Sequence, residues 1–504
     1  MKNLLIMFLM LGFTGFSFFY TDLPKENIFS ISNDVTFDSA YLDANNIRAG
    51  IINDGSFHRP SPHEFNDFIW PKDSNRRNIF SSGLWLAGKV NDSVRGEITY
   101  NYGECYPGFV DFASQVPMGK DDPAFRIYKV SPLFPDGGTG FDNWDLWPVD
   151  QGAPWIDNNG NGNYDPPIDI PLMKGDQNLF CAFTDGYPES HNNYAGGGLP
   201  LNADIHLYCY AKINSTCTDM NFMEWKIINK MNTPWDSARI GVWSDIDIPD
   251  AGSNMMGSDE NLNMGYCYTG GPIEPYNLPR ALGFLIYGVN QRSGILMDFA
   301  NDPRKHFYEP NNIKEAYNQL NGLMKDGTAW INPVNNQVTK YVYNGDPVNG
   351  SGWNCVSRLD QRILIGSDLG TVLPLDTIKF KVAVFITPGS THLEAVANLK
   401  ECAANLVSIT KQNSLLPESF KLFQNYPNPF NPNTVINYEL NSANNVLLKI
   451  FDATGKEVST LVNSRQNAGE YSVRFDGSNL PSGIYFYKII VGKNVASKKM
   501  MLIK

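Results

Sequence analysis

The sequence predicts a mainly β protein: a large, sandwich-like N-terminal region with long loops and two helices, followed by a small C-terminal β-sandwich. Composition is the first reason. There are 43 Gly, 32 Pro and 13% aromatic residues but only 18% charged residues, a profile typical of strands joined by turn-rich loops. The second reason is a series of short runs in which apolar and polar residues alternate. The third is that convincing helical spacing of apolar residues occurs in two segments.

Residues 1–17 are predicted to be a signal peptide. Lys2 supplies the positive start, and residues 4–15 form an apolar run too short to span a bilayer with proper flanks. No other stretch has a transmembrane length of apolar residues, so we expect residues 18–410 to be a secreted cargo region of one large or two medium domains. The formal net charge of −12 disfavours nucleic acid and anionic membranes as partners.

The cargo region contains recognisable hairpin, strand and helix patterns. Residues 80–88 and 97–102 flank the turn residues Asn91, Asp92 and Ser93 and predict a β-hairpin with Trp85 in the core. Further alternating or apolar runs predict strands, and two segments with helical spacing predict the helices. The strands are expected at residues 204–210, 222–228, 239–248, 281–287 and 378–386, and the helices at 312–320 and 391–410.

The seven cysteines are an odd number, so at least one has no partner within the chain. An exported protein meets oxidising conditions, which allow disulfides. Cys209 and Cys217 flank a predicted hairpin turn and are the pair that we expect. No C-x-x-C motif occurs, which argues against zinc or thioredoxin-like redox chemistry.

The weak catalytic candidates are Asp245 and Asp247. On a strand their Cα atoms lie about 7 Å apart on one face, and glycoside hydrolases use carboxyl groups about 5 to 9 Å apart. Trp243 shares that face and could stack on a sugar. The favoured alternative is that both are solvated acids or cation ligands. The six His form no H-E-x-x-H, and there is no G-x-S-x-G, so the balance is against an enzyme.

A polar segment, residues 157–165, has the spacing of an EF-hand-type calcium loop, with Gly162 at the sharp turn. Pro166 and Pro167 preclude the helix that follows an EF-hand loop, and position twelve is Ile168 instead of the bidentate Glu. We expect a calcium-stapled loop; the alternative is an Asn-Gly turn whose side chains bond their own backbone. The five expected Ca²⁺ ligands are Asp157, Asn159, Asn161, the carbonyl of Asn163, and Asp165.

The last 84 residues, 421–504, predict six or so short strands and therefore a two-sheet sandwich, after a polar linker at residues 411–420. Three motifs stand out. A proline-rich stretch opens the domain, a turn-and-strand motif contains Gly483 and Tyr485, and a basic tail contains Lys498 and Lys499. The opening stretch consists of Tyr426, Pro427, Asn428, Pro429, Phe430, Asn431 and Pro432.

These three motifs resemble the type A C-terminal sorting domain of the type IX secretion system, and the resemblance covers about the last sixth of the chain. It implies an immunoglobulin-like sandwich that is recognised at the outer membrane. It also implies the secretion machinery and a sortase-like peptidase as partners, with the cargo released or attached to lipopolysaccharide on the cell surface.

Two functions are left open for the cargo region. The first is a non-enzymatic, calcium-stapled surface or matrix protein. The alternative is a secreted carbohydrate-active enzyme or carbohydrate-binding protein, for which extracellular glycans would be the partners. A pocket lined by Trp243, Asp245 and a second carboxylate would favour the alternative, and a flat acidic surface would favour the first.

Overall fold

The computed structural model describes residues 37–504 with interruptions. The interruptions are residues 60–66, 100–102, 133–143, 160, 192–197, 214–216, 218, 249, 251, 271–277, 288–292, 299–308, 357, 359, 416–419, 426, 441–442, 453–454, 468 and 493. The predicted signal peptide and Tyr426 therefore lie outside the described residues. No helix within the described part is long and apolar enough to cross a membrane.

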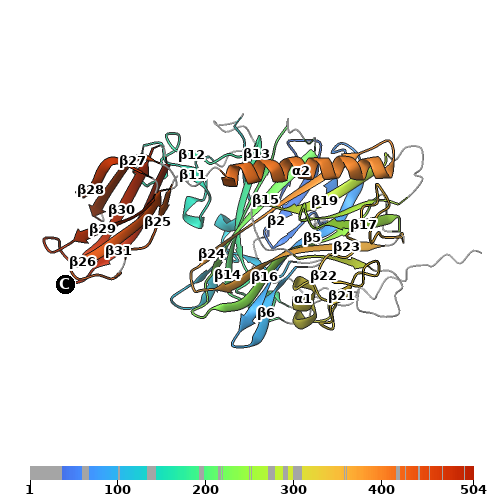
Figure 1. The fold of residues 1–504 in the computed structure, drawn as a ribbon, viewed down its shortest axis with the longest axis horizontal. Helices are drawn as coiled ribbons and strands as arrows, with labels where there is room; N and C mark the ends of the chain where they lie inside the picture. The colour runs from blue at the N-terminus through green and yellow to red at the C-terminus, as the bar shows by residue number, and fades with distance from the viewer. Residues whose placement is uncertain are drawn as a thin grey trace, which may run out of the picture.

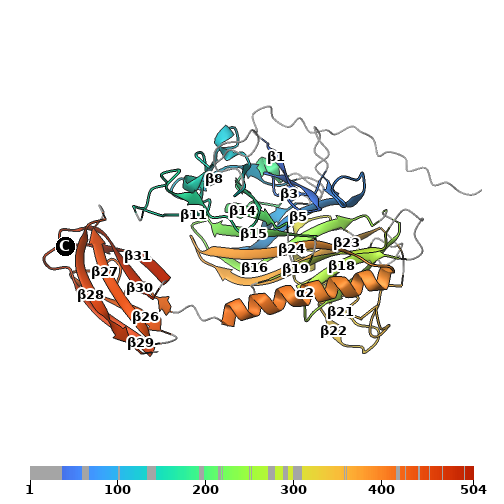
Figure 2. The same cartoon turned by 90° about the horizontal axis from the view of Figure 1, so that it is seen from above.

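The cargo region is built on two nine-stranded antiparallel sheets (Figures 1 and 2). In sheet 1 the order is β1-β2-β3-β5-β16-β23-β20, with β4 and β6 beside β5; in sheet 2 it is β10-β13-β14-β15-β24-β19-β18-β17, with β7 beside β13. The strands of sheet 1 are β1 Ser39–Leu42, β2 Arg48–Ile52, β3 Ser56–Phe57, β4 Phe68–Ile69, β5 Arg77–Val90, β6 Ser93–Ile98, β16 Trp235–Ile246, β20 Ser293–Asp298 and β23 Gln361–Val372. Those of sheet 2 are β7 Tyr106–Pro107, β10 Tyr128–Val130, β13 Gln177–Thr184, β14 Ala203–Ala211, β15 Asp219–Asn229, β17 Asn254–Asp259, β18 Met264–Thr269, β19 Arg280–Ile286 and β24 Thr377–Pro388.

The main core lies between the two sheets. Phe57 of sheet 1 packs on Trp225 of sheet 2 with ring centroids 5.9 Å apart, and both belong to one buried cluster. Sheet 2 buries its other face too: along β13, Leu179 and Cys181 point into this core, whereas Phe180 points into a second cluster. Strands covered on both faces are near-continuously apolar, because neither face needs to be polar.

The second cluster is covered by the long helix α2, His392–Leu415, and by residues 144–173. Helix α2 lies along β18, β19 and β24 (Figure 2), and the short helix α1, Ile313–Leu320, covers part of sheet 1. Both helices confirm the sequence prediction, although α2 continues into the residues 411–420 predicted as a linker. The minor elements are the hairpins β8 Phe109–Asp111 with β9 Val116–Met118, β11 Trp155–Ile156 with β12 Ile170–Pro171, and β21 Trp330–Ile331 with β22 Val338–Thr339.

The predicted hairpin is present as β5 and β6, paired in register from Trp85 with Ile98 to Val90 with Ser93. Its turn residues Asn91 and Asp92 have φ of 50° and 62°, which is the conformation that a two-residue turn needs to match the twist of its strands. Trp85 is fully buried and its indole N–H donates to the carbonyl of Thr99 at 2.7 Å.

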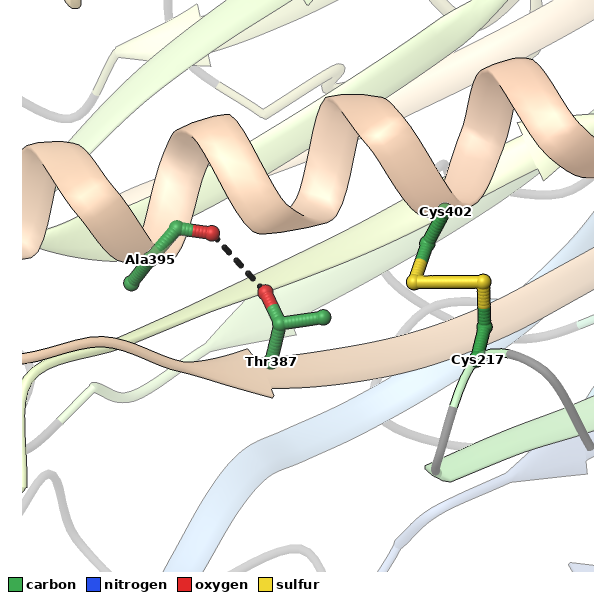
Figure 3. The surroundings of a disulfide bond; sticks show 4 residues. All are labelled: Cys217, Thr387, Ala395 and Cys402. Carbon is green, nitrogen blue, oxygen red and sulfur yellow. Dashed lines mark hydrogen bonds between the residues drawn. A yellow bond between two sulfur atoms is a disulfide. The ribbon is translucent and has the colours of Figure 1, made fainter.

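The prediction that Cys209 pairs with Cys217 is wrong. Cys217 is bonded to Cys402 of α2, with a Cα–Cα distance of 5.4 Å (Figure 3). Cys209 lies on β14 and points into the core between the sheets, whereas Cys217 lies in the cluster on the opposite face of sheet 2. Sequence proximity suggested the pair, but alternation along β14 directs Cys209 into the core between the sheets, whereas Cys217 lies between β14 and β15 and packs on the other face of sheet 2.

The C-terminal region forms the predicted small sandwich. Its three-stranded sheet contains β25, β26 and β29, its four-stranded sheet has the order β28-β27-β30-β31, and one apolar cluster lies between them. Figure 2 shows this sandwich beyond the C-terminal end of α2, clear of the cargo sheets. Its strands are β25 Phe420–Leu422, β26 Asn433–Leu440, β27 Asn444–Asp452, β28 Glu457–Gln466, β29 Gly469–Asp476, β30 Gly483–Val491 and β31 Asn494–Leu502.

Candidate functional site

Three carboxylates converge at one end of sheet 1. Asp245 is the penultimate residue of β16, Asp247 follows that strand, and Asp360 precedes β23. One oxygen from each lies within 4.8 Å of the others, so the group could hold a metal ion. The register of β16 and β23 explains the convergence, because it places Asp245 directly opposite Arg362 and so brings the neighbouring Asp360 to the same end of the sheet.

A single arginine sits among these acids. Arg362 forms a two-point ion pair with Asp360, lies 2.6 Å from Asp245 Oδ1, and lies 3.4 Å from Glu309 Oε1. The contact with Asp245 is an ion pair without hydrogen-bond alignment. Within the described residues the buried Oδ1 atoms of Asp245 and Asp247 accept no hydrogen bond. The Arg362 guanidinium thus contacts three of the four carboxylates, and the charges of Arg77 and Lys325 also act on Asp247 and Glu309.

Burial raises the pKa values of three of these carboxyl groups, because it disfavours their charged forms. It raises the pKa of Asp245 well above its ordinary value, although Arg362 opposes the shift. Burial, with a smaller contribution from Asp360, raises the pKa of Asp247 to about 6. Burial also raises the pKa of Glu309 to about 7, again against the pull of Arg362. Perturbed carboxyls in one place are typical of functional sites, and structural ion-pair networks produce them as well.

Trp243 offers no platform for a sugar. Trp243 is fully buried. It lies on the same face of β16 as Gly241, where a Cβ would come within 2.8 Å of the Leu320 side chain of α1. β16 lies between β5 and β23 in the middle of sheet 1. Its alternating sequence predicted one solvent face, but α1 lies against that face, and the other face packs in the main core.

The predicted calcium loop lies between β11 and β12, whose pairing closes its base. Gly162 has a φ of +80°, as the sharp turn requires. Asp157 Oδ2 accepts the N–H of Gly162 at 2.9 Å, and Asn161 Oδ1 accepts that of Asn163 at 2.7 Å. Asp165 Oδ2 lies 2.5 Å from the amide nitrogen of Asn161. The side chains therefore converge while also bonding their own backbone, and the calcium site stays a prediction.

Asn159, another of the expected ligands, also bonds the loop backbone, whereas Asp169, which is not an expected ligand, closes the loop. Asn159 Oδ1 accepts the N–H of Asn161 at 3.0 Å, in the same pattern. Asp169 is fully buried, and its two oxygens accept the backbone N–H groups of Asn158 and Asp165 at 2.8 and 2.9 Å. Asp169 therefore fixes the ends of the loop to each other, and both of its oxygens already have donors.

A second group of buried acids has a structural task. Asp185 accepts the backbone N–H groups of Leu201 and Ala203, and Glu104 accepts that of Ile98 at 2.7 Å. Burial raises the pKa of Glu97, which lies beside this group, well above its ordinary value. These carboxyls satisfy backbone donors of several strands and loops, which explains their burial without a ligand.

The sorting motifs meet in the C-terminal sandwich. Phe430 is buried in its core, and its backbone N–H and carbonyl bond Met501 and Ile503 at the outer edge of β31. Asn428 Oδ1 accepts the Met501 N–H at 2.9 Å. Pro427 accepts from Thr434 through its carbonyl at 2.8 Å. The proline-rich opening therefore holds the final strand in place, and the prolines themselves offer no N–H to a further strand.

The other motif residues have mixed roles. Tyr485 is buried, and its hydroxyl donates to the carbonyl of Pro481 at 2.9 Å. Gly483 has open space where a Cβ would stand, so its conformation does not require glycine. Lys498 and Lys499 lie on β31, and the Lys499 side chain is exposed. Within the described part, no ion pair of either lysine is observed.

Comparison with known proteins agrees with these motifs. Residues 424–504 match the family model described as a secretion system C-terminal sorting domain. The C-terminal sandwich is thus the sorting domain of the type IX secretion system, and the chain is a protein exported to the cell surface or extracellular space. This domain implies interaction with the type IX secretion machinery.

Solved structures add little about the cargo region. A polysaccharide lyase matches at 10% identity and a TM-score of 0.18 over 60% of this chain and 34% of that one. The latent PorU dimer from Porphyromonas gingivalis matches at 10% identity and a TM-score of 0.16, over 93% of this chain and 34% of that one. PorZ, a surface component of the type IX system of the same organism, matches at 11% identity and a TM-score of 0.13, over 94% of this chain and 75% of that one.

This chain therefore spans about a third of the lyase and of PorU. TM-scores this low carry no argument about fold or activity. A search among curated proteins found no match.

Sequence reasoning found Asp245 and Asp247 but missed Asp360, Arg362 and Glu309. These three lie 60 or more positions further along the chain. The available signal was weak: Asp360 and Arg362 stand two apart at the start of a strand, as Asp245 and Asp247 do near the end of another. Only the pairing of the two strands makes them one site.

Proposed function

We propose that the protein is a non-enzymatic surface or matrix protein whose cargo fold is stabilised by Ca²⁺ bound outside the cell. The observation that carries the proposal is the convergence of Asp245, Asp247 and Asp360 within 4.8 Å. In this proposal residues 1–17 are the signal peptide and residues 18–410 the cargo. Residues 421–504 are an immunoglobulin-like sandwich that a sortase-like peptidase removes, releasing the cargo or attaching it to lipopolysaccharide.

Calcium suits the chemistry of the cluster. All the donors are carboxylate oxygens, which hard cations prefer, and extracellular calcium sites bind with dissociation constants of about 10⁻⁴ to 10⁻³ M. A divalent ion would remove the repulsion among Asp245, Asp247 and Asp360, which Arg362 offsets only in part. Residues 157–165 support a second calcium site, because Gly162 has the turn conformation of a calcium loop.

The second candidate function is a carbohydrate-active enzyme. It is favoured by the raised pKa of Asp247, about 6, since an acid–base catalyst works best with a pKa near the operating pH. Two observations weigh against it. Trp243 is buried and cannot stack on a sugar, and Arg362 is paired with Asp245 and Asp360.

The test is thermal unfolding of the full chain in EDTA and in about 10 mM CaCl₂, which is roughly 100 times a dissociation constant of 10⁻⁴ M. Such an excess stabilises by about 2.7 kcal/mol. For a cargo of about 400 residues this raises the Tm by roughly 3 °C. Asp247→Asn and Asp360→Asn should lose the part of the shift that the carboxylate cluster contributes and keep any part from residues 157–165, while the exposed turn variant Asp92→Asn should keep the whole shift.

A second readout separates lost binding from general damage. In EDTA, Asp247→Asn should melt at or above the parent, because a neutral amide relieves repulsion among buried carboxylates. Asp360→Asn should melt lower, because it also loses the ion pair with the buried Arg362. Variants that melt lower in EDTA yet keep the full calcium shift would contradict the proposal, as would a parent that calcium leaves unmoved. Asp157→Ala tests residues 157–165 by the same measurement, and it should reduce the calcium-induced rise in Tm if this loop binds Ca²⁺. Hydrolysis of a glycan panel by the parent, lost in Asp247→Asn, would establish the enzymatic candidate instead.

A further inference from the structure

The four-stranded sheet of the sorting domain has an unusual solvent face. Residues on β27, β30 and β31 alternate between the core and solvent, and the core side is apolar as expected. The solvent side is also largely apolar, with interspersed lysines. We name it the apolar–basic face; its exposed members are Ile484, Phe486, Val495, Met501 and Lys499, and Lys488 among them is half-buried.

Strand register gathers these side chains into one patch. Ile484 stands opposite Met501, and Phe486 stands opposite Lys499. On the other side of β30, Phe486 stands opposite Phe451 of β27. The four exposed apolar side chains are 38% to 54% accessible to solvent. Directly opposite residues have Cβ atoms about 5 Å apart, so Ile484, Met501 and Phe486 form one apolar group with Phe451. Val495 lies opposite Ile490, beyond a row of Lys449, Lys488 and Ser497.

The other sheet of the same domain is the natural comparison. Its solvent side carries Asn433, Asn437 and Glu439 on β26, with Val435 as the apolar exception. The opposing strand β29 contributes exposed polar residues such as Arg474. A sandwich that only needs solubility has this polar pattern on both outer faces. The apolar–basic face departs from it, and exposed apolar patches mark interaction sites.

The charge of the domain is opposite to that of the cargo. Residues 421–504 contain ten Lys and Arg against five Asp and Glu, a net charge of +5. The whole chain carries −12, so residues 1–420 carry −17. Lys449 of β27 is paired with Glu457 at 2.7 Å. Within the described residues, neither Lys488 nor Lys499 forms an ion pair through its side chain.

We infer that the apolar–basic face is the surface with which the sorting domain docks onto a protein of the type IX export machinery, and that the partner surface is apolar with acidic residues around it. Charge complementarity selects such a partner, because it attracts the domain and repels the acidic cargo. Aromatic and aliphatic groups at the centre of the face would supply most of the binding free energy. The inference rests on the sorting role and is independent of calcium.

A partner can bind the apolar–basic face without breaking hydrogen bonds of the domain, whereas binding at the outer edge of β31 would break some. The outer edge of β31 is partly occupied, because Met501 and Ile503 bond the backbone of Phe430 and Gln424 donates to the carbonyl of Lys499 at 2.8 Å. A partner strand added there would have to displace these bonds. Docking through side chains on the face leaves them intact.

Export of the full chain in a type IX host tests the inference. The face variant combines Phe486→Ser, Lys488→Glu and Lys499→Glu. The matched control combines Val435→Ser and Arg474→Glu on the other sheet. We expect the face variant to lower the exported fraction about tenfold, with accumulation in the periplasm, and the control to be exported like the parent. Equal export of the two variants would overturn the inference.

Two further measurements exclude misfolding and identify the occupant. The purified face variant should keep the Tm of the parent, since the substituted groups lie outside the core. A photo-crosslinking phenylalanine analogue at position 486, but not at position 435, should link to a protein of the export machinery. Adducts with lipid alone, a second copy of this chain or its own cargo would overturn the inference. The calcium shift of the cargo should be unchanged, so failure here is distinct from failure of the calcium proposal.

Discussion

Removing the Cys217–Cys402 disulfide should loosen α2 and lower the stability of the cargo region. The bond joins residues 185 positions apart. A cross-link of that span reduces the entropy of the unfolded chain by an amount equivalent to about 5 kcal/mol at 25 °C, and measured values are typically 2–4. We therefore expect Cys217→Ala with Cys402→Ala to lower the free energy of unfolding by about 2 to 5 kcal/mol.

The helix should remain docked in the folded state of this variant. Thr387 Oγ1 still donates to the carbonyl of Ala395 at 2.8 Å (Figure 3). Lys400 still pairs with Asp259 and Asp346 at 3.3 Å each. Hydrogen exchange should therefore accelerate in α2 before it does in the central strands, because the helix loses its covalent anchor while the sheets keep their core.

The assay is urea denaturation of the full chain, with and without reductant. Reductant should lower the midpoint of the parent to that of the double variant, and should leave the double variant unchanged. Titration of thiols in denaturant should count five of the seven cysteines as free. Seven free thiols in the unreduced parent, or a parent midpoint that reductant does not move, would refute the reasoning.

Two other outcomes are expected. A periplasmic reporter fused to residues 421–504 should be exported in a type IX host. Deletion of Lys498–Lys504 should leave the reporter in the periplasm, because the residues that hydrogen-bond the Phe430 backbone are lost. Cell fractionation that finds the truncated reporter outside the cell would count against this. In EDTA, Glu309 should stabilise the fold fully below pH 4.5 and lose that contribution as the pH rises through about 7, because burial raises its pKa. Urea denaturation should show Glu309→Gln gaining stability relative to the parent between those pH values, whereas a difference that is constant with pH would contradict the assignment.

Much of the fold follows from local sequence. The alternating runs predicted β14, β15, β16, β19 and β24, and the spacing of apolar residues predicted both helices. The Asn91–Asp92 turn fixed the first long hairpin, since few residues accept positive φ at both positions. Helix α1 begins where Asn312 accepts the N–H of Glu315, a cap that can be read from the sequence. These features depend on residues a few positions apart.

The sorting domain is also a property of sequence, because its motifs are short and occur in order. Their physical role became visible only in the fold. Phe430 and Met501 are 71 positions apart, yet their backbones bond each other at the edge of the last strand. The contrast between the two outer faces of the domain needed the register of β30 with β27 and β31, which no single run of residues contains.

The sequence by itself determined the β class, the two helices, the C-terminal sandwich and the export of the chain. Tertiary structure decided that Trp243 is core, that Cys217 joins Cys402, and that Asp360 completes a site with Asp245 and Asp247. The physical reason is the range of the interactions. Periodicity and turn chemistry act between neighbours, whereas strand pairing and the covering of a sheet face join residues more than a hundred positions apart.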